Sequence, residues 1–378
     1  MRASSEISGG VRKRGDNCSC SVAVVAGKGG VPPTRPPTMK DVALAAGVAR
    51  STVSLALRND RSIPPATRGR IFAAAEKLGY RTNPLVSALM ASLHAQRVTH
   101  KHTVLAYVTA DPEFTPWRSF QMFIEMREGA HARALELGYR MEEFPLHGPG
   151  MTPKRYAQML QARGILGLLI APLPPGESAL EVDLKNFAIV GIDMSVRWPS
   201  IERVSNDHFQ SALLAVERCR ALGYRRVGFV MSRHISERLE DRWLSGYYTA
   251  RERIPTDERV TPLMPQTTND ILAALPEWHR REQPDVVIMG EVDPHERYPL
   301  PAHVGMVSLS IEEPSRGTLT GIFQHNRRMG AIAIEHLVAR LERCEFGADD
   351  RGRLHLVAGM WEAGTTALGP GVARQSLV

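Results

Sequence analysis

The sequence predicts an α/β fold of two doubly wound parallel-sheet lobes, preceded by a small all-α unit of three short helices. Two observations support this. Beyond residue 103, strand-like apolar runs alternate with helix-like runs over roughly 270 residues, the pattern of two parallel sheets with helices on both faces. Over residues 39–80, three short helix-like segments are separated by Gly47 and by residues 58–65.

The elements of the large part follow in order. Strand-like runs cover residues 104–109, 140–144, 165–171, 188–192, 226–231, 285–289 and 304–309. Helix-like runs cover residues 120–137, 153–163, 208–222, 238–251 and 327–343. Ahead of them, Asn83 and Pro84 supply an N-cap and a first-turn proline for a short helical segment over residues 85–93.

The composition is that of a globular protein with more than one core. The chain has 378 residues, 43% hydrophobic and 23% charged, so two or three domains are expected. Its longest apolar stretch, residues 165–173, is shorter than the roughly 20 residues of a membrane span, which excludes an integral membrane protein. The four cysteines lack a C-x-x-C spacing, so we expect a reducing, cytoplasmic compartment and no disulfide framework, metal or cofactor.

Charge is distributed unevenly along the chain. Residues 38–101 hold ten Lys or Arg against three Asp or Glu, a net charge of +7. Residues 1–37 hold six against two, and the whole chain carries +7, so residues 102–378 carry −4. A basic unit ahead of a mildly acidic one indicates a polyanionic partner, and nucleic acid fits better than a membrane because no basic amphipathic helix with large apolar residues is present.

Residues 1–37 are rich in Gly, Ser, Pro and Arg and show no periodicity, so we expect a disordered extension. A signal peptide is the weaker alternative, since the apolar run after residues 12–14 is short and interrupted by polar residues. Residues 22–30 resemble a strand leading into a phosphate loop, but prolines follow where that loop needs Lys-Ser/Thr and a helix. A translation start at Met39 is a further alternative.

Residues 40–57 carry the pattern of two helices that cross at a tight turn. Val42 and Ala46 share one face of the first helix, Val53 and Leu57 share one face of the second, and Gly47 permits the positive φ of the turn. The second helix would then expose hydroxyls and one cation, which suit phosphates and base edges. These side chains are Arg50, Ser51, Thr52, Ser54 and Leu55. On spacing alone, a generic three-helix bundle with a solvated surface remains the alternative.

A longer ordered series runs through this unit at one register. It reads Asp41-Val-Ala-x-x-Ala-Gly-Val-x-x-Ser-Thr-Val-Ser54, then Ile63-Pro, Thr67-Arg68, Leu78-Gly-Tyr80 and Asn83-Pro84. The series resembles the DNA-binding headpiece of the LacI/GalR family of transcription regulators. The resemblance implies that Arg50, Ser51 and Leu55 meet bases in the major groove. It implies phosphate contacts for Thr38, Thr52, Ser54, Arg58 and Thr67.

Two residues depart from the family pattern. Leu55 stands where well-known members have Arg, and Ala49 stands where they cap the second helix with Ser. Leucine can contact a thymine methyl group but cannot form a bidentate bond to guanine. The operator of a known member is therefore not carried over to this chain.

Residues 83–91 resemble the family's hinge helix, which folds on DNA as a pair across the dimer axis. Within it, Asn83 opens the helix and is taken as a DNA-binding residue, and Leu89 matches the position that wedges into the minor groove. Such a wedge kinks the duplex and gains contact area in return for unstacking. Ordinary dimer packing is the alternative role of Leu89.

The resemblance continues through residues 102–367, where the family has a two-lobed core like that of type I periplasmic binding proteins, with a ligand cleft. The implied effector-binding residues are Trp117, Arg118, Phe120, Asp193, Arg242, Trp243, Glu291, Ser310 and Gln324. Several depart from the sugar-binding pattern: Trp243 stands where relatives have Arg, and Ser310 where they have Asp. The effector is therefore expected to be unusual or absent.

The expected domains are a disordered extension (1–37), a helix-turn-helix headpiece (38–82), a hinge helix and linker (83–101), a two-lobed effector-binding and dimerisation domain (102–367) and a tail (368–378). The sequence predicts a homodimeric transcriptional repressor that binds a palindromic double-stranded DNA operator. A small-molecule effector, such as a sugar or related metabolite, would modulate its affinity. A regulator without an effector, a solute-binding protein and an enzyme are the alternatives; no Ser-His-Asp, HExxH or intact phosphate-loop motif favours catalysis.

Overall fold

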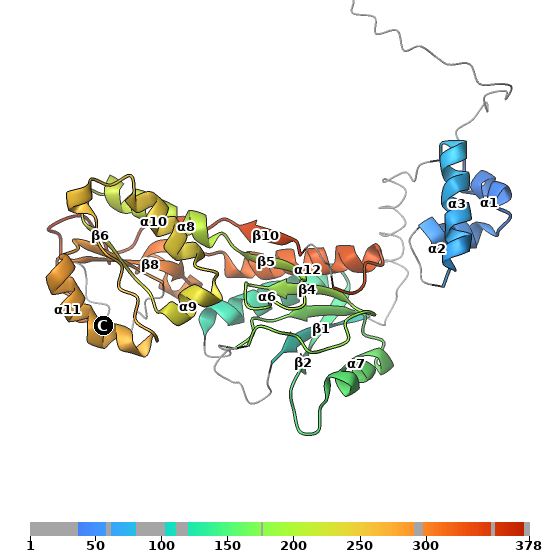
Figure 1. The fold of residues 1–378 in the computed structure, drawn as a ribbon, viewed down its shortest axis with the longest axis horizontal. Coiled ribbons are helices and arrows are strands. Elements are labelled where there is room, and N and C mark those ends of the chain that lie inside the picture. Colours follow the sequence, from blue (N-terminus) through green and yellow to red (C-terminus); the bar gives the residue numbers. More distant parts are fainter. Residues whose placement is uncertain are drawn as a thin grey trace, which may run out of the picture. The chain divides into compact units, whose positions relative to one another are not determined.

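The computed structural model describes residues 37–57, 62–80, 103–110, 120–174, 177–290, 298–348 and 352–373. Contacts divide the chain into two units, one of Met1–Ser54 with Pro65–Arg81 and one of Leu55–Pro64 with Thr82–Val378. Each unit is described by itself, and Figure 1 shows the fold.

The first unit is built around three helices, α1 (Met39–Ala46), α2 (Arg50–Leu57) and α3 (Pro65–Leu78), as the sequence predicted. Thr38 caps α1, because its backbone N–H and hydroxyl both donate to an Asp41 carboxylate oxygen at 2.7 Å. The helix ends at Gly47, whose φ of 64° is left-handed, so the predicted tight turn is confirmed. Val42, Val53 and Ile71 are fully buried.

The second unit contains two sheets. In the first, the strand order is β10-β5-β4-β3-β1-β2, and all the pairings are parallel. The strands are β1 (Thr103–Thr109), β2 (Tyr139–Pro145), β3 (Gly167–Ile170), β4 (Ala188–Ile192), β5 (Glu202–Asn206) and β10 (Leu354–Val357). The helices packed against it are α6 (Gln121–Glu136), α7 (Pro153–Ala162) and α12 (Asn326–Glu342).

Helices cover both faces of the first sheet because successive strand residues point to opposite sides. Leu105 and Leu169 pack with α6 and α12, whereas the adjacent Ala106 and Leu168 pack with α7. Both sets are apolar, as expected for parallel strands buried on two faces. The predicted doubly wound architecture is confirmed for this sheet.

The second sheet has the order β11-β9-β8-β7-β6, with β11 antiparallel to β9 and the other pairings parallel. Its strands are β6 (Val227–Val230), β7 (Val286–Met289), β8 (Gly305–Ile311), β9 (Thr320–Phe323) and β11 (Met360–Glu362). α8 (His208–Ala221) and α10 (Arg242–Arg251) pack on one face, and α11 (Asn269–Glu282) packs on the other. Three short elements complete it: α9 (Arg233–Arg238), η1 (Thr256–Glu258) and η2 (Glu313–Ser315).

The described chain crosses between the two sheets from β5 to α8, from β9 to α12 and from β10 to β11. The two sheets with their helices therefore form two lobes joined by several connections, and we call them lobe 1 and lobe 2. No helix in the described ranges is both long enough and apolar enough to span a membrane.

The helix expected over residues 238–251 is wrong in extent. α9 ends at Arg238, and Glu240 and Asp241 adopt left-handed φ angles of 54° and 53° before α10 begins. The Asp241 carboxylate accepts a hydrogen bond from the Ser236 hydroxyl at 2.7 Å, which stabilises this reversal. The sequence reading also missed β5, α11, β9, β10 and β11, which are short or polar or, in α11, contain a proline.

Candidate DNA-binding unit and ligand cleft

The α1–Gly47–α2 pair has the form of a helix-turn-helix. At the start of α2, Arg50 and Ser51 are exposed, so their side chains are available to a partner. Thr52, Ser54 and Leu55 are half-buried rather than fully outward, because they flank the buried stripe of Val53 and Ala56. Thr67, on α3, is also half-buried, and Thr38 is exposed. Arg58, Asn83 and Leu89 lie outside the described residues.

In the large unit, a pocket of about 220 Å³ lies between the two lobes. Its lobe 1 residues follow β3 and β4, and its lobe 2 residues lie on α9, which follows β6. The lining residues are Pro174, Glu177, Ser178, Ser195, Arg197, His234, Glu237 and Arg238. This is the carboxyl-terminal edge of both sheets, where open parallel sheets bind ligands.

Asp193 lies beside this pocket and pairs across the two lobes. It follows β4 with a left-handed φ of 69° and is 6% exposed. Its Oδ2 atom is 3.6 Å from Arg238 Nη2, and the Ser205 hydroxyl donates to its Oδ1 at 3.5 Å. A non-glycine residue in this backbone region is uncommon and occurs preferentially at functional sites. The carboxylate that the sequence proposed as a ligand contact is therefore held by a cation of the opposite lobe.

Two further polar contacts join the lobes near α9. Arg197, which follows β4, donates to the backbone carbonyl of Glu237. Arg203 Nη1 on β5 is 3.8 Å from Glu240 Oε1. Together with the Asp193 pair, these contacts fasten lobe 1 to the end of α9, so a change in the angle between the lobes would have to alter them.

His208, at the start of α8, is a buried neighbour of this site that the sequence reading missed. Its ring meets Trp243 edge to face, with the ring centroids 4.7 Å apart. Burial lowers the pKa of His208, the Asp193 charge opposes this effect and the Arg242 charge adds to it. The imidazole is consequently neutral at pH 7.

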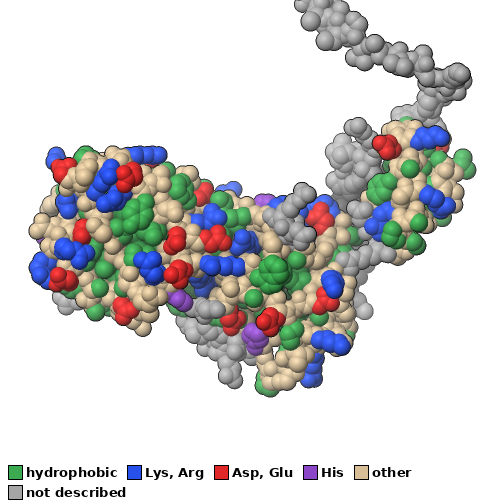
Figure 2. Space-filling model, viewed as in Figure 1, with side chains coloured by type: hydrophobic (Ala, Val, Ile, Leu, Met, Phe, Trp, Pro, Cys, Tyr) green, Lys and Arg blue, Asp and Glu red, His purple; other side chains and the backbone are tan. Residues whose placement is uncertain are grey.

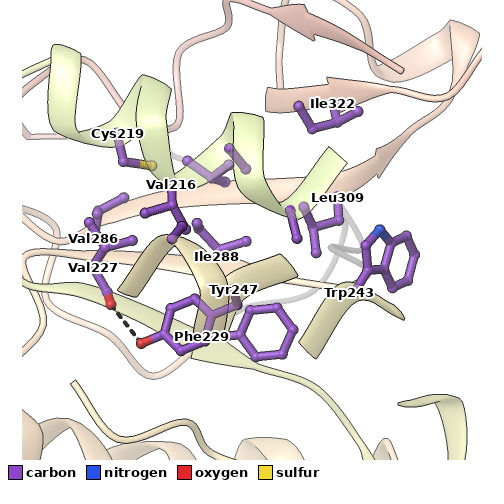
Figure 3. Packing of buried hydrophobic residues seen from close by; sticks show 14 of the residues in the cluster. Val216, Cys219, Val227, Phe229, Trp243, Tyr247, Val286, Ile288, Leu309 and Ile322 are labelled. Atoms are coloured by element: carbon purple, nitrogen blue, oxygen red, sulfur yellow. Dashed lines mark hydrogen bonds between the residues drawn. The ribbon is translucent and has the colours of Figure 1, made fainter. Parts of the chain in front are cut away.

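Trp243 is 4% exposed and lies at the border of the lobe 2 hydrophobic cluster, as Figure 3 shows. In the same cluster, the hydroxyl of Tyr247 donates to the Val227 carbonyl at 3.0 Å. The indole ring of Trp243 is therefore held in the core, and its Nε1–H group is the part that a ligand could contact.

Several buried polar atoms around the crossings between the lobes have no hydrogen-bond partner among the described residues. They are Asn206 Oδ1, His208 Nδ1, Ser211 Oγ, Arg242 Nε, Trp243 Nε1 and Gln324 Oε1. Buried polar groups are nearly always satisfied, by protein, water or ligand. A set that mixes donors and acceptors is suited to a polar molecule or to ordered water.

The remaining effector residues inferred from sequence have different surroundings. Phe120 is 49% exposed and packs edge to face on Phe123, with the ring centroids 5.9 Å apart. The Ser310 backbone N–H donates to the Ser308 hydroxyl, and the Gln324 amide donates to the Leu309 carbonyl. Arg242, by contrast, lies beside His208 and pairs with Glu240 at 3.3 Å. Trp117, Arg118 and Glu291 lie outside the described residues.

A buried carboxylate on α6 provides a second connection between the lobes that sequence reasoning missed. Glu125 is fully buried and accepts hydrogen bonds from the Asn326 amide at 3.2 Å and from the Glu313 backbone N–H at 2.9 Å. The Asn206 amide donates to Asn326 at 3.5 Å. These residues are distant in sequence, so no local motif could have revealed the network.

Acidic and basic side chains are interleaved over the face of the large unit that Figure 2 displays. This mixture agrees with the mild net charge of residues 102–378, in contrast to the basic residues 38–101. The electrostatic preference for a polyanion therefore belongs to the N-terminal part of the chain.

These features define the class: a helix-turn-helix unit joined to a two-lobed α/β unit with a pocket between its lobes. Residues 38–83 match the family model described as "Bacterial regulatory proteins, lacI family". The N-terminal unit is therefore similar to the DNA-binding part of lacI-family regulators, and the relatives that the chain matches are named as regulators.

Two curated relatives illustrate the similarity. The maltose regulon regulatory protein MalI of Escherichia coli (strain K12) is 31% identical over 202 residues, which cover 51% of this chain and 53% of MalI. The transcriptional repressor PurR of Aliivibrio salmonicida (strain LFI1238) is 25% identical over 215 residues, which cover 56% of this chain and 60% of PurR. The chain thus spans between half and two thirds of the length of these relatives.

A solved structure shares the fold of the large part of the chain. The LacI family transcriptional regulator from Enterococcus faecium, with bound ribose, superposes with a TM-score of 0.51 at 16% identity. The match covers 71% of this chain and 99% of that protein. At this identity the match shows the fold, and it agrees with the two parallel-sheet lobes described above.

Proposed function

We propose that the protein is a sequence-specific transcriptional repressor that binds a palindromic operator as a homodimer. The observation that carries this proposal is the helix-turn-helix of residues 38–83, which matches the lacI family and leaves Arg50 and Ser51 exposed at the start of α2. Two headpieces related by the twofold axis of a dimer would read two half-sites. Residues 38–82 would be the headpiece, 83–101 the hinge and linker, and 102–367 the sensor and dimerisation domain, flanked by an extension (1–37) and a tail (368–378).

The DNA contacts are assigned to three groups. Arg50, Ser51 and Leu55 would meet base edges in the major groove. Thr38, Thr52, Ser54, Arg58 and Thr67 would contact phosphates and fix the register of the headpiece. Asn83 and Leu89 would act through the hinge, where Leu89 opens a base step in the minor groove.

A small polar molecule bound between the lobes would modulate the affinity for DNA. Support comes from the 220 Å³ pocket, the unpartnered polar atoms near Trp243 and His208, and the ion pair of Asp193 with Arg238. The name of MalI refers to a maltose regulon, and the Enterococcus faecium structure contains ribose, so a sugar or a related metabolite is the proposed class of effector. A ligand that favours one angle between the lobes would shift the spacing of the two hinges and hence the DNA affinity.

In this proposal, the protein acts in the cytoplasm as a binding protein and not as an enzyme. The relatives are named as regulators, and transcriptional control requires access to DNA. A regulator that takes no small-molecule input is the second candidate, because Trp243 and Ser310 depart from the sugar-binding pattern of the family.

The headpiece assignment can be tested with two arginine variants and a charge-matched control. Fluorescence anisotropy would compare operator and random duplexes at several salt concentrations. Arg50→Ala should lose affinity for the operator by about 1–3 kcal/mol and relax base preference, because one good base contact contributes that much discrimination. Arg58→Ala should weaken binding to all duplexes and reduce the salt slope by about 1.

The control is Arg253→Ala, which removes a cation from the large unit and should leave both curves unchanged. Equal losses on operator and random DNA for Arg50→Ala would contradict its role as a base reader.

A further inference from the structure

Glu202, His336 and His355 form a compact cluster in lobe 1. Glu202 begins β5, His355 lies on the neighbouring β10 and His336 lies on α12. His355 Nε2 is 2.8 Å and His336 Nδ1 is 3.0 Å from the same carboxylate atom, Glu202 Oε1. The two imidazole rings are stacked, with their centroids 3.7 Å apart. Because Glu202 starts its strand, the cluster lies at the opposite end of β5 from the ligand pocket.

The donor atoms have the arrangement of a metal site. One ligand atom from each residue lies within 4.8 Å of the others. A tetrahedral zinc ion with bonds of about 2.0–2.2 Å separates its ligands by about 3.3–3.6 Å, so each histidine nitrogen would have to move away from Glu202 Oε1 by about 0.3–0.8 Å to admit the ion. Two imidazoles with one carboxylate form a common zinc ligand set that leaves a fourth position for water. Nitrogen donors disfavour Mg²⁺ and Ca²⁺, which prefer oxygen.

We propose that Glu202, His336 and His355 bind one divalent transition-metal ion, with zinc as the best fit. A cation also resolves the crowding in the cluster, since it would let both stacked imidazoles direct a lone pair to a shared positive centre. In its absence, both rings lie against the same carboxylate oxygen, Glu202 Oε1.

The surrounding charges position the carboxylate. Arg340 Nη1 lies 3.1 Å from the other oxygen of Glu202, Oε2, and leaves Oε1 to face the imidazoles. Arg353 Nη2 is 3.9 Å from Oε2 and 3.6 Å from Glu345, which also pairs with Arg343 at 2.7 Å. Such partners orient metal ligands. The positive charge of Arg340 opposes a second cation, so we expect micromolar rather than nanomolar affinity.

The three ligand residues differ in burial, which holds the carboxylate in place and leaves the histidines accessible to solvent. The Glu202 side chain is 1% exposed, whereas the side chains of His336 and His355 are 30% and 33% exposed. The carboxylate is therefore held in place, and an ion can arrive from solvent on the side of the rings. Once bound, the ion would tie α12 to β5 and β10, two strands whose chains continue into lobe 2, and would stabilise the fold by mass action.

Isothermal titration of the full chain, free of any affinity tag, with zinc chloride at pH 7.5 would test the proposal. Cys18 and Cys20 are possible competing thiol ligands, so the measurement is made in a Cys18→Ser/Cys20→Ser background. One zinc per chain should bind with micromolar affinity. His336→Gln and His355→Gln should each weaken binding at least tenfold, since loss of even an outer-shell partner of a metal ligand costs about 10–100-fold in affinity. His131→Gln, which alters an exposed histidine on α6, should bind as the background does.

A spectroscopic measurement on the chain that retains both histidines tests the proposal even if a histidine variant folds poorly. Cobalt bound to the Cys18→Ser/Cys20→Ser chain should show visible d–d bands of nitrogen and oxygen coordination, and equimolar zinc should abolish them. The absence of such bands, the absence of zinc binding up to about 100 µM, or unchanged binding in both histidine variants would overturn the proposal.

Discussion

Removal of Arg238 should destabilise the large unit by breaking one of the contacts between its lobes. The Arg238 side chain is 16% exposed, and its partner Asp193 is 9% exposed at the side chain, with their charged atoms 3.6 Å apart. Among the described residues, substitution by alanine leaves the buried Asp193 carboxylate with the long 3.5 Å hydrogen bond from the Ser205 hydroxyl. An uncompensated buried charge is costly because water no longer solvates it.

The magnitude follows from the distance and the burial. At 3.6 Å, two unit charges attract by about 4–5 kcal/mol at an effective dielectric constant of about 20. Breaking a buried pair by deleting one partner costs about 3–5 kcal/mol. Arg238 retains some solvent exposure and does not reach the shortest ion-pair distance, so we expect Arg238→Ala to lower the free energy of unfolding by about 2–3 kcal/mol.

Urea unfolding followed by tryptophan fluorescence would measure this loss. The matched control is Arg253→Ala, which deletes a closer pair with Glu217 at 3.1 Å whose side chains are 62% and 53% exposed. Exposed pairs contribute about 0–1 kcal/mol, so the control should change little despite its shorter distance. Asp193→Asn combined with Arg238→Ala should recover part of the loss. Equal costs for Arg238→Ala and Arg253→Ala would refute the argument from burial.

Three other perturbations give distinct expectations. Gly330→Ala should lower the free energy of unfolding in urea by about 1–3 kcal/mol, because a Cβ at this position would lie 1.9 Å from the Met126 carbonyl oxygen. In the control Gly148→Ala, the added Cβ meets no atom within 4 Å, so the free energy of unfolding should stay within about 0.5 kcal/mol of the parent. Burial lowers the pKa of His208, so the unfolded chain takes up a proton at this histidine at a higher pH than the folded chain does. The stability contributed by neutral His208 is therefore present above about pH 6.5 and is lost as pH falls towards the folded pKa, by up to about 1.4 kcal/mol per pH unit. His208→Gln should flatten this part of the plot of urea midpoint against pH. Leu89→Ala should reduce the bend of bound DNA measured by energy transfer between duplex ends; an unchanged bend would favour dimer packing for Leu89.

The sequence predicted the apolar elements well. β4 runs over Ala188–Ile192, as expected, because five apolar residues buried on both faces leave a continuous signal. β5 was missed because Glu202, Ser205 and Asn206 are buried through pairing partners elsewhere in the chain, which hydropathy does not reveal. The break between α9 and α10 was missed because its left-handed residues are Glu240 and Asp241 rather than glycine.

The site was partly predictable for the same reason. Asp193 could be proposed because it directly follows a strand, at the edge where ligands bind. His208 and Arg238 could not, because their significance comes from side chains distant in sequence: His208 meets Trp243 of its own lobe, and Arg238 meets Asp193 of the other lobe. The cluster of Glu202, His336 and His355 joins residues from three separate elements, so no spacing along the chain indicates it.

Sequence-specific recognition of DNA by a dimer is tested by selecting binding sites from random duplex DNA with the purified chain. Selection should recover a palindrome whose half-sites flank a flexible central step, and Arg50→Ala should lose base preference within the half-sites. Salt-sensitive binding without enrichment of any sequence, over a range of ionic strengths, would refute sequence-specific recognition.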